Sequence, residues 1–171
     1  MNIPKIKMLI LDVDGTMTDN GIYIDENGVE SKRYNAKDGV GIYELIKNNI
    51  KIGIISHSEK GDGIKSRASY LGIKYCYVGN EPKDKILLGW MNQENITKDS
   101  IAFIGDDIND LSIINIVGFS ACPSDASNKV KDKVSLILKS KGGYGCVREF
   151  SDLYSVSYTH LRTHETNLDL V

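Results

Sequence analysis

Short apolar runs alternate along the chain with segments whose apolar residues are spaced as on one face of a helix. The first run, 8–11, is continuous and stops abruptly at Asp12, which is typical of a parallel strand buried on both faces. Similar runs follow at 52–55, 75–78, 101–104, 119–121 and 136–138. The segments between these runs have apolar residues at helical spacing, as at Ile42, Leu45 and Ile46. The alternation predicts an α/β fold with a Rossmann-like parallel sheet, whose ligands bind beyond the carboxyl ends of its strands.

One segment breaks this alternation directly after the first strand. Residues 22–24 and 29–34 flank Asn27-Gly28, and that dipeptide between apolar stretches is the strongest short-range signal for a β-hairpin. Because the hairpin follows the first strand, we expect it to project over the carboxyl edge of the sheet.

Composition narrows the class of protein. A chain of 171 residues suits one domain, and a net charge of -2 gives no electrostatic case for binding nucleic acid or an anionic membrane. The three cysteines are widely spaced, without a disulfide framework or CxxC pair. The run 8–11 is too short for a signal-peptide core or a membrane span. We therefore expect a cytoplasmic enzyme or binding domain.

Four polar features follow predicted strands and would meet at one edge of the sheet. They are Asp12 with Asp14, Ser56, Lys83, and the acidic run 105–110. A single Asp at such a place is commonly a turn or helix cap. Four polar features at strand ends together are seldom all caps, which points to a functional site. Clustered carboxylates repel one another unless a hard cation neutralises them, which favours a magnesium site.

This inventory suits phosphoryl transfer, which needs positioning and charge neutralisation from a metal, a lysine and hydrogen-bond donors. Asp12 can attack phosphorus, and Asp14 can act as the acid and base. Lys83 and Ser56 fit the neutralising and donating roles, although Lys85 lies close to Lys83 in the chain.

The segment 12–16, Asp-Val-Asp-Gly-Thr, resembles the DxDGT signature of the haloacid dehalogenase superfamily. Ser56, Lys83 and the run 105–110 resemble its second, third and fourth motifs, and the likeness covers residues 5–153. The resemblance implies Asp12 as nucleophile and Asp14 as acid and base. It implies Mg²⁺ held by Asp12, the Asp14 backbone carbonyl and Asp106, with support from Asp107, Asn109 and Asp110.

Within that superfamily the chain resembles small capless phosphatases of 2-keto-3-deoxy sugar acids. Thr18-Asp19, the segment 35–39, and the glycine loop 141–145 with Arg148-Glu149 carry this likeness. It implies a hairpin flap in place of a cap domain, 3-deoxy-octulosonate 8-phosphate as substrate, and a homotetramer whose hairpins pack between subunits. A guanidinium can grip a sugar-acid carboxylate. The expected substrate contacts are Thr16, Lys37, Asp38, Gly39, Glu59, Gly143 and Arg148.

Three other interpretations stay open. The loop Ser56-His-Ser-Glu59 departs from the octulosonate pattern. The substrate could instead be a nine-carbon sugar acid 9-phosphate, such as that of sialic acid, with Glu59 as a contact to the sugar acid. The chain could also be a non-catalytic assembly domain of a sugar-activating enzyme. Such a domain would have no need to keep Asp12, Asp14, Lys83 and Asp106 together, and this chain keeps all four. A phosphorylated receiver domain is disfavoured by Asp14 and by the early hairpin.

The C-terminal segment 155–171 is expected to add nothing to a domain of residues 1–154. Residues 156–166 resemble the translation of a sequencing adapter and are therefore interpreted as a non-native tail. His160 and His164 stand four apart within it, a spacing that suits metal ligands on a helix, but we assign them to the tail.

Overall fold

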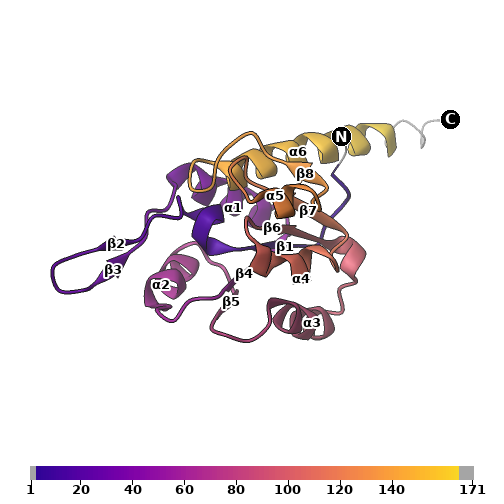
Figure 1. The fold of residues 1–171 in the computed structure, drawn as a ribbon. Helices are drawn as coiled ribbons and strands as arrows, with labels where there is room; N and C mark the ends of the chain where they lie inside the picture. The colour runs from indigo at the N-terminus through magenta and orange to yellow at the C-terminus, as the bar shows by residue number, and fades with distance from the viewer. Residues whose placement is uncertain (1–2, 166–171) are drawn as a thin grey trace.

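A computed structural model describes the backbone of residues 3–165 and side chains up to residue 157. Its centre is a six-stranded, fully parallel sheet with the strand order β5-β4-β1-β6-β7-β8 (Figure 1). The strands are β1 (Met8–Leu11), β4 (Lys51–Ser56), β5 (Tyr75–Val78), β6 (Ile101–Ile104), β7 (Phe119–Cys122) and β8 (Leu136–Ile137). This confirms the predicted α/β class and its parallel sheet.

The order of the strands places a switch point beside β1. The chain runs from β1 to β4 and β5 on one side, then returns to β6, β7 and β8 on the other. Leu11 pairs with Ile54 of β4 and with Ile104 of β6, so the three strands end close to the same level. Crevices at such switch points are where open α/β sheets bind ligands.

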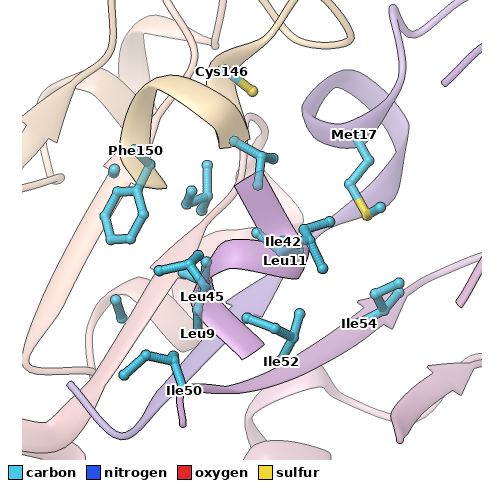
Figure 2. Close-up of a cluster of buried hydrophobic side chains, with 14 of the residues drawn as sticks. Leu9, Leu11, Met17, Ile42, Leu45, Ile50, Ile52, Ile54, Cys146 and Phe150 are labelled. Carbon is cyan, nitrogen blue, oxygen red and sulfur yellow. The ribbon is translucent and has the colours of Figure 1, made fainter. Parts of the chain in front are cut away.

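One face of the sheet is covered by α1 (Ala36–Lys47) and α6 (Cys146–Glu165), which pack against each other (Figure 1). Leu9 and Leu11 of β1 contribute to this core with Ile42 of α1 and Phe150 of α6 (Figure 2). All four side chains are buried, and removing such apolar surface from water stabilises the fold.

The opposite face holds a second core. Met8 and Ile10 point there because side chains alternate along a strand, and they join Leu87, Phe103 and Ile113. All four residues of β1 are fully buried, which explains its unbroken apolar run. The helical segments between α1 and α6 are α2 (Asp62–Tyr70), α3 (Lys83–Glu94), η2 (Lys98–Ser100), η3 (Ile108–Asp110), α4 (Leu111–Ile114) and α5 (Asn128–Lys131).

The predicted hairpin is present as β2 (Tyr23–Ile24) and β3 (Glu30–Ser31), and it extends away from the body of the domain (Figure 1). Its tip turns at Gly28, whose φ is 75°, while the Asp25 carboxylate accepts two tip amide hydrogen bonds. The strands are shorter than the sequence suggests, because side chains such as Ile24 are largely exposed and gain little by pairing.

The expected domain boundary at residue 154 falls inside α6, which continues to Glu165. Ser157 is buried, and its hydroxyl donates to the Leu153 carbonyl at 3.0 Å and accepts from the Ile3 amide at 3.5 Å. The side chains of His160 and His164 lie outside the described residues. No helix in the described part of the chain has the length and apolarity needed to cross a bilayer.

Candidate active site

Asp12 sits directly after β1, where its amide donates to the Ile104 carbonyl of β6 at 2.9 Å. This bond continues the ladder between the two strands and fixes the residue at the switch point. Its side chain is almost fully buried. The chain then reverses through residues 12–18, which we call the Asp12 turn and which contains η1 (Val13–Met17).

The conformation of the Asp12 turn depends on Gly15. Its φ of 80° is one that L residues with side chains rarely adopt, and a Cβ at this position would overlap the Asp106 carboxylate. Gly15 therefore lets the turn after β1 approach the loop after β6. The carboxylates of Asp12 and Asp106 face one site for this reason.

Lys83, the first residue of α3, reaches into this site from the other side. Its ammonium lies 2.5 Å from Asp12 Oδ1 and 2.6 Å from Asp110 Oδ1, and the lysine side chain has no exposed surface. By contrast, the Lys85 ammonium is exposed and pairs with Glu81 at 2.6 Å. The structure thus places Lys83, and not Lys85, against Asp12.

Asp110 organises the acidic loop after β6. One of its carboxylate oxygens accepts a hydrogen bond from the Lys83 ammonium. The other accepts hydrogen bonds from the backbone amides of Asp106 at 2.9 Å and Asp107 at 3.2 Å. Gly105 is needed here, because a Cβ would overlap the Asp110 carboxylate. Asp110 is fully buried and fully engaged, so it acts as a support for the loop.

The two facing carboxylates have raised pKa values. Burial raises the pKa of Asp12 to about 7, with a further contribution from Asp110 and opposition from Lys83. Burial also raises the pKa of Asp106 to about 8, helped by the negative charges of Asp12, Asp110 and Asp107. A single lysine does not neutralise this many buried carboxylates.

A hard cation fits this arrangement. Carboxylate oxygens of Asp12, Asp106 and Asp110 lie within 4.8 Å of one another, and oxygen donors of this kind are the ligands that Mg²⁺ prefers. Because both Asp110 oxygens are engaged, Asp12 and Asp106 are left to bind the ion. The Asp14 backbone carbonyl, expected from the family motif, comes from the same turn as Asp12.

Mg²⁺ is expected to raise the melting temperature by roughly 5 °C or more at saturation, and by more at about pH 8.5 than at about pH 6. Without metal, folding favours the protonated forms of Asp12 and Asp106, because their pKa values in the folded protein lie above the unfolded value of about 4. Their contribution to the free energy of unfolding is complete below a pH of about 4 and is lost as the pH rises from there through 7 to 8.

The larger effect at high pH follows because Mg²⁺ binds the ionised carboxylates. Thermal denaturation with and without Mg²⁺ across this pH range measures both effects. Asp106→Asn is the matched control, because it removes a ligand with little change in shape. A Mg²⁺ shift that does not grow with pH would contradict the assignment.

The carboxylates open into a cavity of about 330 Å³ at the carboxyl edge of the sheet. Its predicted lining residues are Asp12, Asp14, Ser56, Asp106, Asp107 and Asn109, and they are joined by Asn20, His57 and Ile108. Ser56 ends β4 and is buried. The structure therefore brings together the strand-end residues that the sequence predicted to meet.

Lys32 and Asn20 are site residues that the sequence did not suggest. The Lys32 ammonium, just after β3, lies 2.6 Å from Asp14 Oδ1. Asn20 lines the cavity with a φ of 63°. The only signal for Lys32 was its place after the hairpin strand, and no motif spacing marks it.

Several expected substrate contacts lie elsewhere. Asp38 is buried in α1 and accepts the Arg148 amide at 2.8 Å, so it caps the start of α6. The Arg148 guanidinium lies 2.8 Å from Asp152 on the same helix. Thr16 is buried within the Asp12 turn. Neither Asp38 nor Arg148 lines the cavity of its own chain, and their expected contacts with the substrate stay predictions.

The other expected contacts are spread around the site. Gly39 lies against the Arg67 side chain, and Lys37 donates its amide to the Asn35 side chain at the start of α1. The Gly143 carbonyl accepts hydrogen bonds from Arg33 and Asn35 of the same chain. Glu59 lines a separate groove, of about 970 Å³, between the hairpin and α2.

Comparison with known proteins agrees with this geometry. Residues 79–149 match the family of the haloacid dehalogenase-like hydrolases. The 3-deoxy-D-manno-octulosonate 8-phosphate phosphatase of Haemophilus influenzae is 34% identical over 151 residues, which are 88% of this chain and 83% of that protein. The chain belongs to the haloacid dehalogenase-like hydrolases.

Solved structures narrow the likeness to one group of these hydrolases. The 3-deoxy-D-manno-octulosonate 8-phosphate phosphatase of Yersinia pestis has a TM-score of 0.87 and 34% identity, covering 92% of this chain and 84% of that one. The Moraxella catarrhalis enzyme of the same name, in complex with magnesium, phosphate and KDO, has a TM-score of 0.86 and 28% identity. It covers 95% of this chain and 93% of that chain.

Proposed function

We propose that the protein is a magnesium-dependent phosphatase of a 2-keto-3-deoxy sugar acid phosphate, with 3-deoxy-D-manno-octulosonate 8-phosphate as its preferred substrate. The observation that carries this proposal is the buried Asp12 carboxylate, held by Lys83 and facing Asp106 across the cavity. The phosphatases named above, similar over most of this chain, support the choice of substrate.

In this proposal the Asp12 oxygen that does not bind Lys83 attacks phosphorus and forms an aspartyl phosphate. Asp14 gives a proton to the leaving sugar oxygen, then takes one from the water that hydrolyses the intermediate. Asp12, Asp106 and the Asp14 carbonyl would hold Mg²⁺, which would supply positive charge beside the phosphoryl group. Ser56 donates a hydrogen bond to a phosphoryl oxygen, and Lys83 stays on Asp12.

The groove between the hairpin and α2 is our candidate for the sugar-acid binding site. It begins at Lys32, which contacts Asp14, and at Ser58, next to the cavity-lining His57. Two buried polar atoms at this groove, Arg67 Nε and the Tyr34 hydroxyl, have no hydrogen-bond partner among the described residues. Such groups are costly to bury unless a ligand or water satisfies them.

A guanidinium suits the carboxylate of a sugar acid. We therefore propose that Arg67 binds the carboxylate of the sugar acid, the contact that the sequence suggested for Arg148. Besides Arg67, the groove is lined by three lysines, Lys32, Lys60 and Lys65, and by three acidic residues, Glu30, Glu59 and Asp62. Arg67 therefore leaves the lining with an excess of one positive charge, which suits an anionic substrate.

Glu59 supports a second candidate substrate, the 9-phosphate of a nine-carbon sugar acid. It lines the same groove, where a carboxylate can accept hydrogen bonds from the additional polar groups of a longer sugar. The reaction and the roles of Asp12 and Asp14 are unchanged in this alternative.

Substrate preference is measured as kcat/KM across eight- and nine-carbon keto-deoxy sugar acid phosphates, with hexose phosphates and a small aryl phosphate for comparison. We expect the eight-carbon acid to be preferred over hexose phosphates by about 100-fold or more, because a buried charge pair is lost without the carboxylate. Preference for a hexose phosphate would contradict the sugar-acid assignment.

The Arg67→Ala variant, with Arg148→Ala as its matched control, tests the groove in the same assay. Arg67→Ala should raise KM for the sugar acid phosphate and spare the aryl phosphate, whereas Arg148→Ala should change neither. A selective loss in Arg148→Ala instead would return the carboxylate contact to α6.

We also propose that copies of this chain assemble into a tetramer through the hairpin. Ile22 and Ile24 on the hairpin expose 69% and 66% of their surface, and Val29 exposes 59%. Such apolar side chains on a projecting element suit an interface between protein chains. Light scattering gives the mass in solution, and a monomer would remove this part of the proposal.

A further inference from the structure

The glycine loop, residues 141–145, lies directly against the Asp12 turn of the same chain. A Cβ built on Gly142 would overlap the Gly15 carbonyl group, and one on Gly143 would overlap the backbone at Thr18. The Gly143 amide donates to the Thr16 carbonyl at 3.0 Å. Only residues without side chains permit this approach, which explains two of the loop's glycines.

The contact reaches the candidate metal ligands through Gly15. One side of Gly15 faces the Asp106 carboxylate, and its carbonyl group faces Gly142. The peptide between Thr16 and Met17 is held as well, because the Thr16 carbonyl also accepts a hydrogen bond from the Cys146 thiol at 3.1 Å. The Asp12 turn is therefore packed between the acidic loop after β6 and the glycine loop.

Carboxylates from three other parts of the fold fix the glycine loop and its flanks. Asp125, after β7, accepts the Gly142 amide at 3.0 Å. Glu149 accepts two amides just before the loop, at 2.9 and 2.8 Å, and Asp38 accepts the Arg148 amide just after it. Hydrogen bonds from amides to ionised carboxylates are among the stronger ones in proteins.

We propose that Asp125 and Gly142 are positioning residues for the reaction at Asp12. Asp125 holds the Gly142 backbone against Gly15, and Gly15 in turn fixes the turn that carries the Asp12 and Asp14 side chains. Neither Asp125 nor Gly142 lines the cavity, so neither touches the reacting atoms. The inference rests on the proposed phosphatase function for its kinetic consequences, but its effect on metal affinity does not require turnover.

The expected effects follow from the geometry of attack. A misplacement of about 1 Å at the reacting groups can cost about 100-fold in rate. The Asp12 turn joins the attacking carboxylate to the acid through two peptide bonds, so a shift of the Gly15 peptide moves both groups. Such a shift lowers kcat while leaving the binding groove between the hairpin and α2 in place.

Asp125→Ala and Asp125→Asn form the first test. The alanine variant removes the acceptor of the Gly142 amide, and the asparagine variant keeps a side-chain oxygen there. With a small aryl phosphate we expect kcat to fall about tenfold or more in Asp125→Ala, with KM within about threefold of wild type, and to recover in Asp125→Asn. Unchanged kcat in the folded alanine variant would overturn the proposal.

Gly142→Ala is the second test, with Gly145→Ala as its control. Gly145 has a φ of 99°, and a Cβ there would meet no other atom within 4 Å, so alanine strains the backbone without contacting the Asp12 turn. We expect about a 100-fold loss of kcat in Gly142→Ala only. Equal losses in kcat, measured on the folded fraction, would show a general effect of the loop and overturn the inference.

Mg²⁺ affinity, measured by calorimetry without substrate, separates this inference from the proposed function. Because Gly15 contacts the Asp106 carboxylate, Gly142→Ala should weaken Mg²⁺ binding about tenfold relative to Gly145→Ala. This holds even if no phosphate ester is hydrolysed, an outcome that would defeat the proposed function alone. Equal Mg²⁺ affinity in the two variants would count against the inference. If Gly142→Ala does not fold, the kcat values of Asp125→Ala and Asp125→Asn test the inference.

Discussion

Asp12→Asn is expected to reduce phosphate release by about ten-thousandfold or more, because the amide is not a competent nucleophile. The domain should still fold, since asparagine keeps the shape of the residue and removes one of several mutually repelling buried carboxylates. Phosphate release at saturating substrate and far-ultraviolet circular dichroism measure the two properties.

Asp99→Asn is a suitable control for Asp12→Asn. Asp99 is exposed and lies in η2, just before β6 and therefore at the opposite edge of the sheet from Asp12. We expect this variant to keep most of the activity. Turnover near the wild-type value in Asp12→Asn would remove Asp12 from the role of nucleophile.

The second large effect is expected for Lys83→Met, which should lower the free energy of unfolding by about 3–5 kcal/mol. Methionine fills similar space but leaves Asp12 and Asp110 buried without their shared cation. Activity should fall as well, because an unpaired Asp12 changes its position and protonation. Urea denaturation measures the stability, and added Mg²⁺ should restore part of it.

Lys85→Met is the matched control, because the lysine lies two residues away on the same helix. Its ammonium is exposed and pairs with Glu81 at the surface, and such pairs contribute little. We expect no measurable change in stability or turnover. Equal destabilisation in the two variants would show that α3 is sensitive to any charge removal, and that the buried cluster is not the cause.

The sequence determined the sheet and the gathering of the strand-end residues. The run 8–11 ends at Asp12, and the run 101–104 ends just before Asp106. Parallel strands present their carboxyl ends at one edge, so residues that follow neighbouring strands meet without further information. The family motif added their expected roles.

Side-chain partners between distant segments were decided by the tertiary structure. The sequence did not predict that the Asp38 carboxylate accepts the Arg148 amide at the start of α6, 110 residues away along the chain. The reason is the packing of α1 against α6, which brings the start of α6 onto a buried carboxylate. Periodicity shows that each helix has an apolar face, but it does not show which helices meet.

The glycine loop, residues 141–145, shows the same difference between what the sequence indicates and what the tertiary structure decides. Its glycines indicated a backbone that can approach another segment closely. In the structure its partner is Gly15 of the same chain, and Lys32 of the hairpin reaches Asp14. Local sequence fixes what a backbone segment permits, whereas the partner depends on how the whole chain packs around the sheet.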